Sequence, residues 1–202
     1  MLEDNTLTAL PTSILSLLTS HVVGLSFAQG ALTSWCVELD NSTTAATATA
    51  TSTLRSLNLS GCPLNSPPYF SSRHLSSLLV LDLSFTEVPD FQSLEFSQLV
   101  NLRRLALEDC SLETLHSDDG ISSPLQSLVA LEYLNISDND LSNMDDVHPA
   151  LSYVAATLLE LDARENELQE NLGRNKYNQF MLTDVSVARL EKSGVWCHCF
   201  EL

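Results

Sequence analysis

The apolar residues of the chain recur in a pattern that fits neither a plain helix nor a plain strand. In the stretch LEYLNISDNDL they fall at Leu131, Leu134, Ile136 and Leu141, with Asn139 between the last two. A helix would place apolar residues every three or four positions, and a strand would place them at every second position. Here a spacing of three changes to a spacing of two. The pattern therefore predicts a short strand between tight turns, with its apolar side chains packed inward.

Six copies of this pattern follow one another in one register. Their matching positions are Val22, Leu25, Phe27, Gly30 and Leu32, then Leu54, Leu57, Leu59, Cys62 and Leu64, then Leu78, Leu81, Leu83, Thr86 and Val88, then Leu102, Leu105, Leu107, Cys110 and Leu112, then Leu131, Leu134, Ile136, Asn139 and Leu141, and last Leu158, Leu161, Ala163, Asn166 and Leu168. The copies resemble the leucine-rich repeat, L-x-x-L-x-L-x-x-N/C-x-L. The resemblance covers about residues 22–170. It implies an α/β solenoid of about six repeats, with a parallel sheet on its concave side and a shared core that only stacked repeats can bury.

The segments between the copies predict the convex side of this solenoid. Early segments are rich in proline, which argues against long helices there. Later, Val147, Leu151, Val154 and Leu158 recur at helical spacing and predict a helix over 145–158, with Pro149 in its first turn. We therefore expect the convex side to change from irregular structure to helix along the chain.

The ninth position of each copy is predicted to turn inward where the chain leaves the strand. An asparagine amide there can bond to backbone groups that otherwise lack partners, and each bare group costs about 1–3 kcal/mol. Cys62, Thr86 and Cys110 offer smaller and weaker partners at this position. Gly30 offers none, so we expect the first copy to be distorted.

Outside the repeats the chain divides into further segments. Residues 1–21 are predicted to lead into the repeats or to form a degenerate cap, and residues 41–53 form a low-complexity loop rich in threonine and alanine. Residues 171–202 are predicted to form a cap-like segment followed by an irregular tail. Within them KYNQFML resembles the helical cap of intracellular leucine-rich repeat proteins that include a phosphatase regulator and ciliary and tubulin-cofactor relatives. The ending GVWCHCFEL fits no repeat, so a truncated gene model is an open explanation for it.

Charge narrows the classes of partner. Acidic residues number 26 and basic residues 9, which gives a formal net charge of −17. Binding to nucleic acid relies on Lys and Arg against phosphates, so we expect none. No run of 18 apolar residues is present, so we expect no membrane insertion. A protein partner with a basic surface would complement the charge, although the charge could serve solubility alone.

Cysteine usage favours a reducing compartment. The repeats account for Cys62 and Cys110, and the remaining cysteines form no four-cysteine cap of the kind that closes secreted repeat proteins. We therefore expect a cytoplasmic protein. Glycosylation sequons at Asn41, Asn58 and Asn135 keep open the alternative of a secreted or receptor-derived recognition module.

The cluster Cys197-His198-Cys199 carries the second alternative, a metal-binding or enzymatic protein. Soft ligands this close could hold part of a zinc site, but a structural site needs four ligands. The sequence has no nucleophile motif and no glycine-rich phosphate loop. We therefore predict no enzyme, no cofactor and no metal.

The residues between the leucines are the candidate binding groups. Alternate residues of a strand face opposite sides, so the third, fifth and seventh repeat positions face outward, with the eighth beside them. Tyr and Arg among them are typical of interface centres. We predict a monomeric, non-catalytic scaffold that binds a protein partner through Val80, Asp82, Phe85, Arg104, Glu108, Tyr133, Asn135, Asp138, Glu160, Asp162 and Arg164. The preference for this face is implied by the resemblance to leucine-rich repeats.

Overall fold

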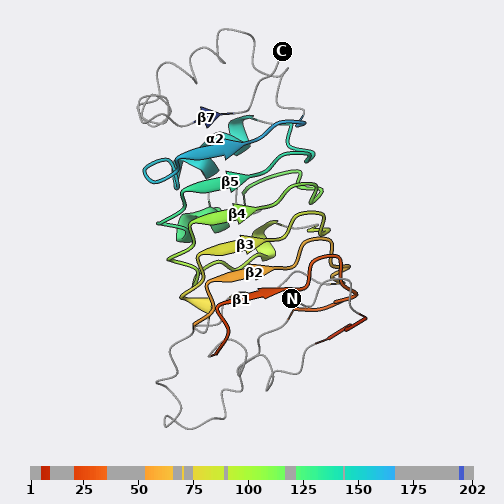
Figure 1. The fold of residues 1–202 in the computed structure, drawn as a ribbon. Helices are drawn as coiled ribbons and strands as arrows, with labels where there is room; N and C mark the ends of the chain where they lie inside the picture. The colour runs from red at the N-terminus through yellow and green to blue at the C-terminus, as the bar shows by residue number, and fades with distance from the viewer. Residues whose placement is uncertain are drawn as a thin grey trace.

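The repeats stack as one parallel sheet whose strands follow chain order (Figure 1). The computed structural model describes residues 6–9, 21–35, 53–65, 70, 75–88, 91–116, 122–142, 144–166 and 196–197. The strands are β1 (Gly24–Ser26), β2 (Ser56–Asn58), β3 (Val80–Asp82), β4 (Arg104–Ala106), β5 (Tyr133–Asn135), β6 (Glu160–Asp162) and β7 (Trp196–Cys197).

The register of the sheet is the one that the repeat pattern predicts. The fourth position of each repeat pairs with the fourth position of the next: Leu25 with Leu57, Leu57 with Leu81, Leu81 with Leu105, Leu105 with Leu134, and Leu134 with Leu161. All these leucines are buried. The predicted α/β solenoid, with one short strand in each repeat, is confirmed.

A single hydrophobic core runs through the stack from Leu25 to Ala163. It consists mainly of leucines from the repeat positions, as stacking requires. Buried aromatic rings pack together within it: Phe96 lies 5.9 Å from Phe70 and 6.3 Å from Phe91 between ring centroids. Gly30 is also buried, and its N–H donates to the carbonyl of Phe27 at 2.9 Å.

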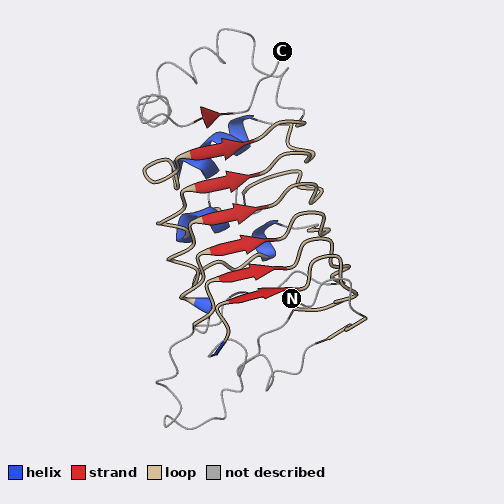
Figure 2. Ribbon diagram, in the orientation of Figure 1, coloured by secondary structure: helices blue, strands red, loops and turns tan. Residues whose placement is uncertain are grey.

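The convex side becomes more helical along the chain, as predicted. Its described helical elements are the 3₁₀ helices η3 (Phe91–Ser93) and η4 (Pro124–Ser127), and the α-helix α2 (Met144–Ser152). Figure 2 shows them on one side of the strands. The other side of the sheet, which is the predicted concave side, is called the sheet face below.

Two details of the predicted helix 145–158 are wrong. Helix α2 ends at Ser152, and Pro149 lies inside it, not in its first turn. The following residues form turns, in which the N–H of Leu158 donates to the carbonyl of Val154 at 3.0 Å. Such turns preserve the three- and four-residue spacing, so Val154 and Leu158 are still buried. The apolar spacing therefore predicted burial correctly but overestimated the length of the helix.

The C-terminal end also departs from expectation. Strand β7 pairs in parallel with β6, with Glu160 opposite Trp196 and Leu161 opposite Cys197. The prediction that this part is an irregular tail is therefore wrong for these two residues. Backbone pairing needs only the open N–H and C=O groups of the last strand, not the leucine pattern.

Several predicted segments lie largely outside the described residues. They are most of the N-terminal segment 1–21, nearly all of the loop 41–53, the cap-like stretch KYNQFML, and His198 and Cys199 of the Cys-His-Cys cluster. Among the helices that are described, none is long and apolar enough to cross a membrane.

Candidate functional site

A left-handed turn at the eighth repeat position fixes the edge of the sheet face. The residues there have φ between 50° and 65° in every repeat: Gln29, Gly61, Phe85, Asp109, Asp138 and Glu165. Their N–H groups continue the ladder beyond the strands. For example, Phe85 donates to the carbonyl of Glu108 at 2.7 Å, and Asp138 donates to that of Arg164 at 3.0 Å. The eighth residues therefore stand in one regular row.

Asparagine at the ninth position binds backbone groups as predicted. Oδ1 of Asn139 accepts from the N–H groups of Cys110 and Leu112, each at 3.0 Å. Its Nδ2 donates to the carbonyls of Leu107, Ile136 and Ser137 at 2.8–3.0 Å. Asn166 makes the same kind of contacts in the last repeat.

The smaller residues at the ninth position make fewer contacts. The Cys110 thiol donates to the carbonyls of Leu83 at 3.2 Å and Glu108 at 3.5 Å, and the Cys62 thiol donates to that of Phe27 at 3.2 Å. The Thr86 hydroxyl donates to the carbonyl of Leu59 at 3.2 Å. Both cysteines are free and buried, and burial raises the pKa of the Cys110 thiol to about 12.

The residues at each outward repeat position form a row across the strands of the sheet face. Arg104 and Tyr133 meet in the third row. They are register partners on β4 and β5, and the Arg104 guanidinium carbon lies 4.8 Å from the centroid of the Tyr133 ring. Arg104 is exposed and Tyr133 is half-buried. A cation over a tyrosine ring is an attractive arrangement, so the pair is held in place before any partner arrives. Val80 and Glu160, the other predicted contacts of this row, are half-buried.

The side chains of the fifth row, which the sequence predicted to contact a partner, have a structural role. A side-chain oxygen of Asp82, Asn135 and Asp162 accepts from the N–H group two residues later, at 3.0, 2.9 and 3.2 Å. Asn135 is 7% exposed and Asp162 is 8% exposed. The expectation that these two side chains are open to a partner is therefore corrected: they close the turn after each strand. Asp82 is half-buried.

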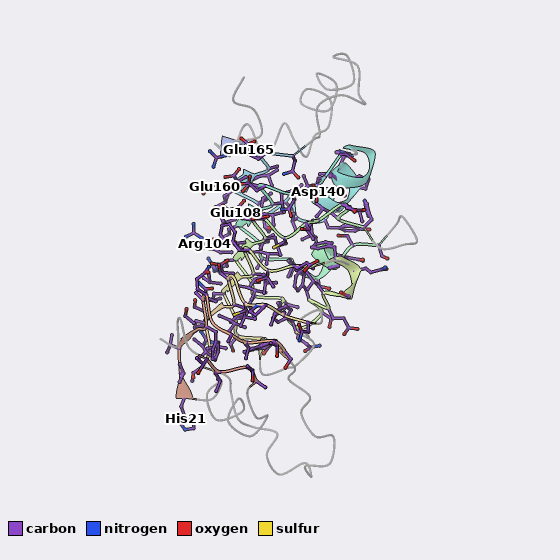
Figure 3. All side chains as sticks on the ribbon, turned by 90° about the vertical axis from the view of Figure 1, so that its right-hand side faces the viewer. His21, Arg104, Glu108, Asp140, Glu160 and Glu165 are labelled. Carbon is purple, nitrogen blue, oxygen red and sulfur yellow. The ribbon has the colours of Figure 1, made fainter. Side chains whose placement is uncertain are left out.

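The seventh row is partly tied to the fifth. Nδ2 of Asn135 donates to Glu108 at 3.1 Å. The Arg164 guanidinium forks onto both carboxylate oxygens of Asp162, at 3.0 and 2.8 Å. Glu108 and Arg164 nevertheless remain accessible at the sheet face. In Figure 3, Arg104, Glu108 and Glu160 lie along one margin of the molecule, whereas Asp140 lies nearer the helical side.

The eighth row is exposed in every repeat except the second, where Gly61 is half-buried. Phe85 is 49% exposed, and Asp138 is exposed as predicted. The predicted contact set omits Asp109 and Glu165, which are exposed at the same position. Their shared position in the repeat is the signal that identifies them.

Negative charge surrounds the tyrosine in the middle of the face. The pKa of Tyr133 is raised, first by burial and then by the carboxylates of Glu160 and Asp162, while Arg104 opposes the shift. The sequon residue Asn135 lies in the same region, and its burial leaves no room for a glycan in the folded chain.

The metal alternative gains no second cluster from the described part of the chain. Among those residues no group of three or more His, Cys, Asp or Glu side chains could hold a metal ion. Since His198 and Cys199 lie outside the described residues, the Cys-His-Cys hypothesis stays a prediction.

The repeat spacing, the parallel stack and the inward ninth position define a leucine-rich repeat solenoid. A family model described as Leucine Rich Repeat matches residues 53–73, which include the second repeat. No curated protein matches the chain. Among solved structures the chain is similar to an internalin C2 from Listeria monocytogenes, with 21% identity and a TM-score of 0.51. The match covers 91% of this chain and 62% of the internalin chain, and it shows a shared fold.

Proposed function

We propose that this chain is a non-catalytic scaffold that binds a protein partner on its sheet face. The observation that carries the proposal is the Arg104–Tyr133 pair in the middle of that face. Arginine and tyrosine dominate binding energies at protein interfaces, above all where they are central and lose water on binding. Here the two side chains already hold each other, so less conformational freedom is lost when a partner covers them.

The compartment and subclass belong to the same proposal. The proposal is of a cytoplasmic, monomeric protein of the phosphatase-regulator, ciliary and tubulin-cofactor class. Free, buried thiols at Cys62 and Cys110 support the reducing compartment. A thiol titration of the denatured protein, isolated without reductant, tests the compartment. Reaction of all cysteines supports it, whereas recovery of disulfides favours the secreted alternative.

Paired capture experiments test the binding role. The full chain and its Tyr133→Ala variant are immobilised, and proteins retained from a lysate are compared by quantitative mass spectrometry. Candidate partners are the proteins that the wild type retains and a blank surface does not, and their depletion on the variant is the test. With a depleted protein purified, Tyr133→Ala should weaken binding by about 2 kcal/mol, or about 30-fold, mainly through faster dissociation.

Tyr153→Ala is the matched control. Tyr153 is 38% exposed and directly follows α2, which lies on the other side of the strands (Figure 2). It should leave the kinetics unchanged. If the Tyr133 variant dissociates like the wild type, and binding is lost instead on deleting residues 41–53 or 194–202, the site does not lie on the sheet face.

A further inference from the structure

The accessible side chains of the sheet face change in character along the stack. At β3 the third and eighth positions are apolar: Val80 is half-buried, and the Phe85 ring is 49% exposed, with the half-buried Asp82 between them along the chain. Arg104 and Tyr133 occupy the middle. Toward β6 the face carries the carboxylates of Asp138, Glu160 and Glu165. The face therefore presents two apolar side chains at β3, called the apolar end below, and three carboxylates toward β6, called the acidic end.

The acidic end is not neutralised by the ion pairs of the described residues. Those pairs are Arg103 with Glu132 at 2.7 Å and Arg164 with Asp162 at 2.8 Å, and neither includes Asp138, Glu160 or Glu165. Like charges on neighbouring strands repel one another. Glu160 is the register partner of Tyr133, and after burial it is the next cause of the raised pKa of Tyr133. A cation supplied by a partner would relieve the repulsion.

The apolar end carries an unfavourable residue at an exposed position. Phe85 has φ of 59°, a region in which bulky side chains are uncommon. Gly61 fills the same position one repeat earlier with φ of 65°, as the turn prefers. A half-exposed ring adds little to the core of this chain. The ring is therefore available for contact with another molecule.

We propose that the partner contributes a segment that crosses the strands, with an apolar side chain on Phe85 and Val80 and with lysine or arginine side chains over Asp138 and Glu160. This inference rests on the proposed function of the sheet face. Along one row of the face, from Phe85 to Asp138 or from Val80 to Glu160, adjacent strands lie about 4.8 Å apart, so the apolar and acidic side chains are separated by about 10–14 Å. An extended segment spans that distance in about three or four residues. Figure 3 shows Glu160 on the same margin as Arg104.

Two labelled peptides of equal composition serve as probes for the intact chain. In one peptide, two leucines are followed by three serines and then by two lysines. In the other, the same leucines, lysines and serines are interleaved. By fluorescence anisotropy in low salt, the segregated peptide should bind about tenfold more tightly. Its affinity should fall as salt is added, because screening weakens the contacts between lysines and carboxylates.

Variants of the chain assign the two ends. Combined Asp138→Asn and Glu160→Gln should weaken the segregated peptide about fivefold. Asp140→Asn, which removes an exposed charge nearer the helical side, should not. Phe85→Gly should also weaken the peptide while leaving the melting temperature equal or higher, since glycine suits this turn.

Equal affinity for the two peptides, or equal loss on Asp140→Asn, would overturn the proposed polarity. That result would leave the proposed function standing if Tyr133→Ala still releases the captured partner. Conversely, a captured partner that is indifferent to Tyr133→Ala rejects the proposed function, whatever the peptides do.

Discussion

The turns of the last two described repeats differ from those of the three before them. Asn139 makes five hydrogen bonds to backbone groups of its own repeat and the preceding one. In the earlier repeats, the Cys110 thiol and the Thr86 hydroxyl each donate to carbonyl oxygens alone, at 3.2–3.5 Å. Thiols are weak donors, so the same position stabilises the two regions very differently.

The backbone of the two regions is nevertheless alike at the eighth position. The residue before the turn has φ of 59° ahead of Thr86, 50° ahead of Cys110 and 54° ahead of Asn139. At the tenth position they differ: Ser111, after Cys110, has φ of 56°, whereas Asp140, after Asn139, has no positive φ. Stacking between repeats therefore sets the turn as far as the eighth position, and the path beyond it varies with the residue at the ninth. The comparison predicts that the regions share their core energetics and differ only in their turns.

The largest expected effect tests the shared part. Leu105 and Leu134 are paired, fully buried leucines. Leu105 belongs to the repeat with Cys110 at the ninth position, and Leu134 to the repeat with Asn139. Replacing either by alanine should lower the free energy of unfolding by about 2–5 kcal/mol, because each leaves a cavity in the same core. Urea titrations followed by circular dichroism measure both. Arg55→Ala, at an exposed position, serves as control and should change stability by about 0.5 kcal/mol or less. A large difference between the two leucines would mean that the cores also differ.

The turns themselves should differ next. Asn139→Ala leaves buried N–H and C=O groups without partners and should cost about 3 kcal/mol in the same titration. Cys110→Ala removes only a weak donor and a small volume, and should cost about 1 kcal/mol. Equal costs would show that the hydrogen bonds of Asn139 add nothing to the turn.

Introducing an amide into the earlier region should have a smaller and opposite effect. The backbone before Cys110 resembles that before Asn139, so Cys110→Asn should place its amide near the carbonyls of Leu83 and Glu108. The gain should be about 1 kcal/mol, the usual net value of a hydrogen bond. The reverse change, Asn139→Cys, should destabilise the chain. If Cys110→Asn destabilises it as well, each turn is fitted to its own residue.

The inward positions of the fold were predictable because the leucine spacing of the repeat specifies them directly. Leucine spacing gave the register from Leu25 to Leu161, and the ninth position gave the contacts of Asn139. Strand β7 was missed because Trp196 and Cys197 pair through backbone groups that leave no side-chain pattern. The length of α2 was overestimated because turns bury the same spacing as a helix.

The sheet face was less predictable than the core. Alternation places Arg104 and Tyr133 outward, and their contact follows from adjacent strands. It also places Asn135 and Asp162 outward, but their short side chains bend back to bond the N–H groups two residues on. Asparagine and aspartate often make such local bonds, and the alternation pattern does not register them. Candidate contacts of these residue types therefore needed the structure to sort them.

The last prediction concerns the pH dependence of the unfolding free energy, and its effect is the smallest near neutral pH. Cys110 can ionise, whereas Asn139 cannot. Burial raises the pKa of the Cys110 thiol from 9.0 to about 12, so the folded chain favours the neutral thiol. The resulting stability is fully present below pH 9 and is lost as pH rises from 9 toward 12. Wild type and Cys110→Asn should therefore show a constant difference in unfolding free energy between pH 7 and 8. Above pH 9 the wild type should lose stability faster, as urea titrations at each pH would record.

Other ionising groups are common to both proteins and cancel in the difference. A constant difference up to pH 10.5 would mean that the turn tolerates a thiolate, and that the earlier repeats are less closed to water than the burial of Cys110 implies.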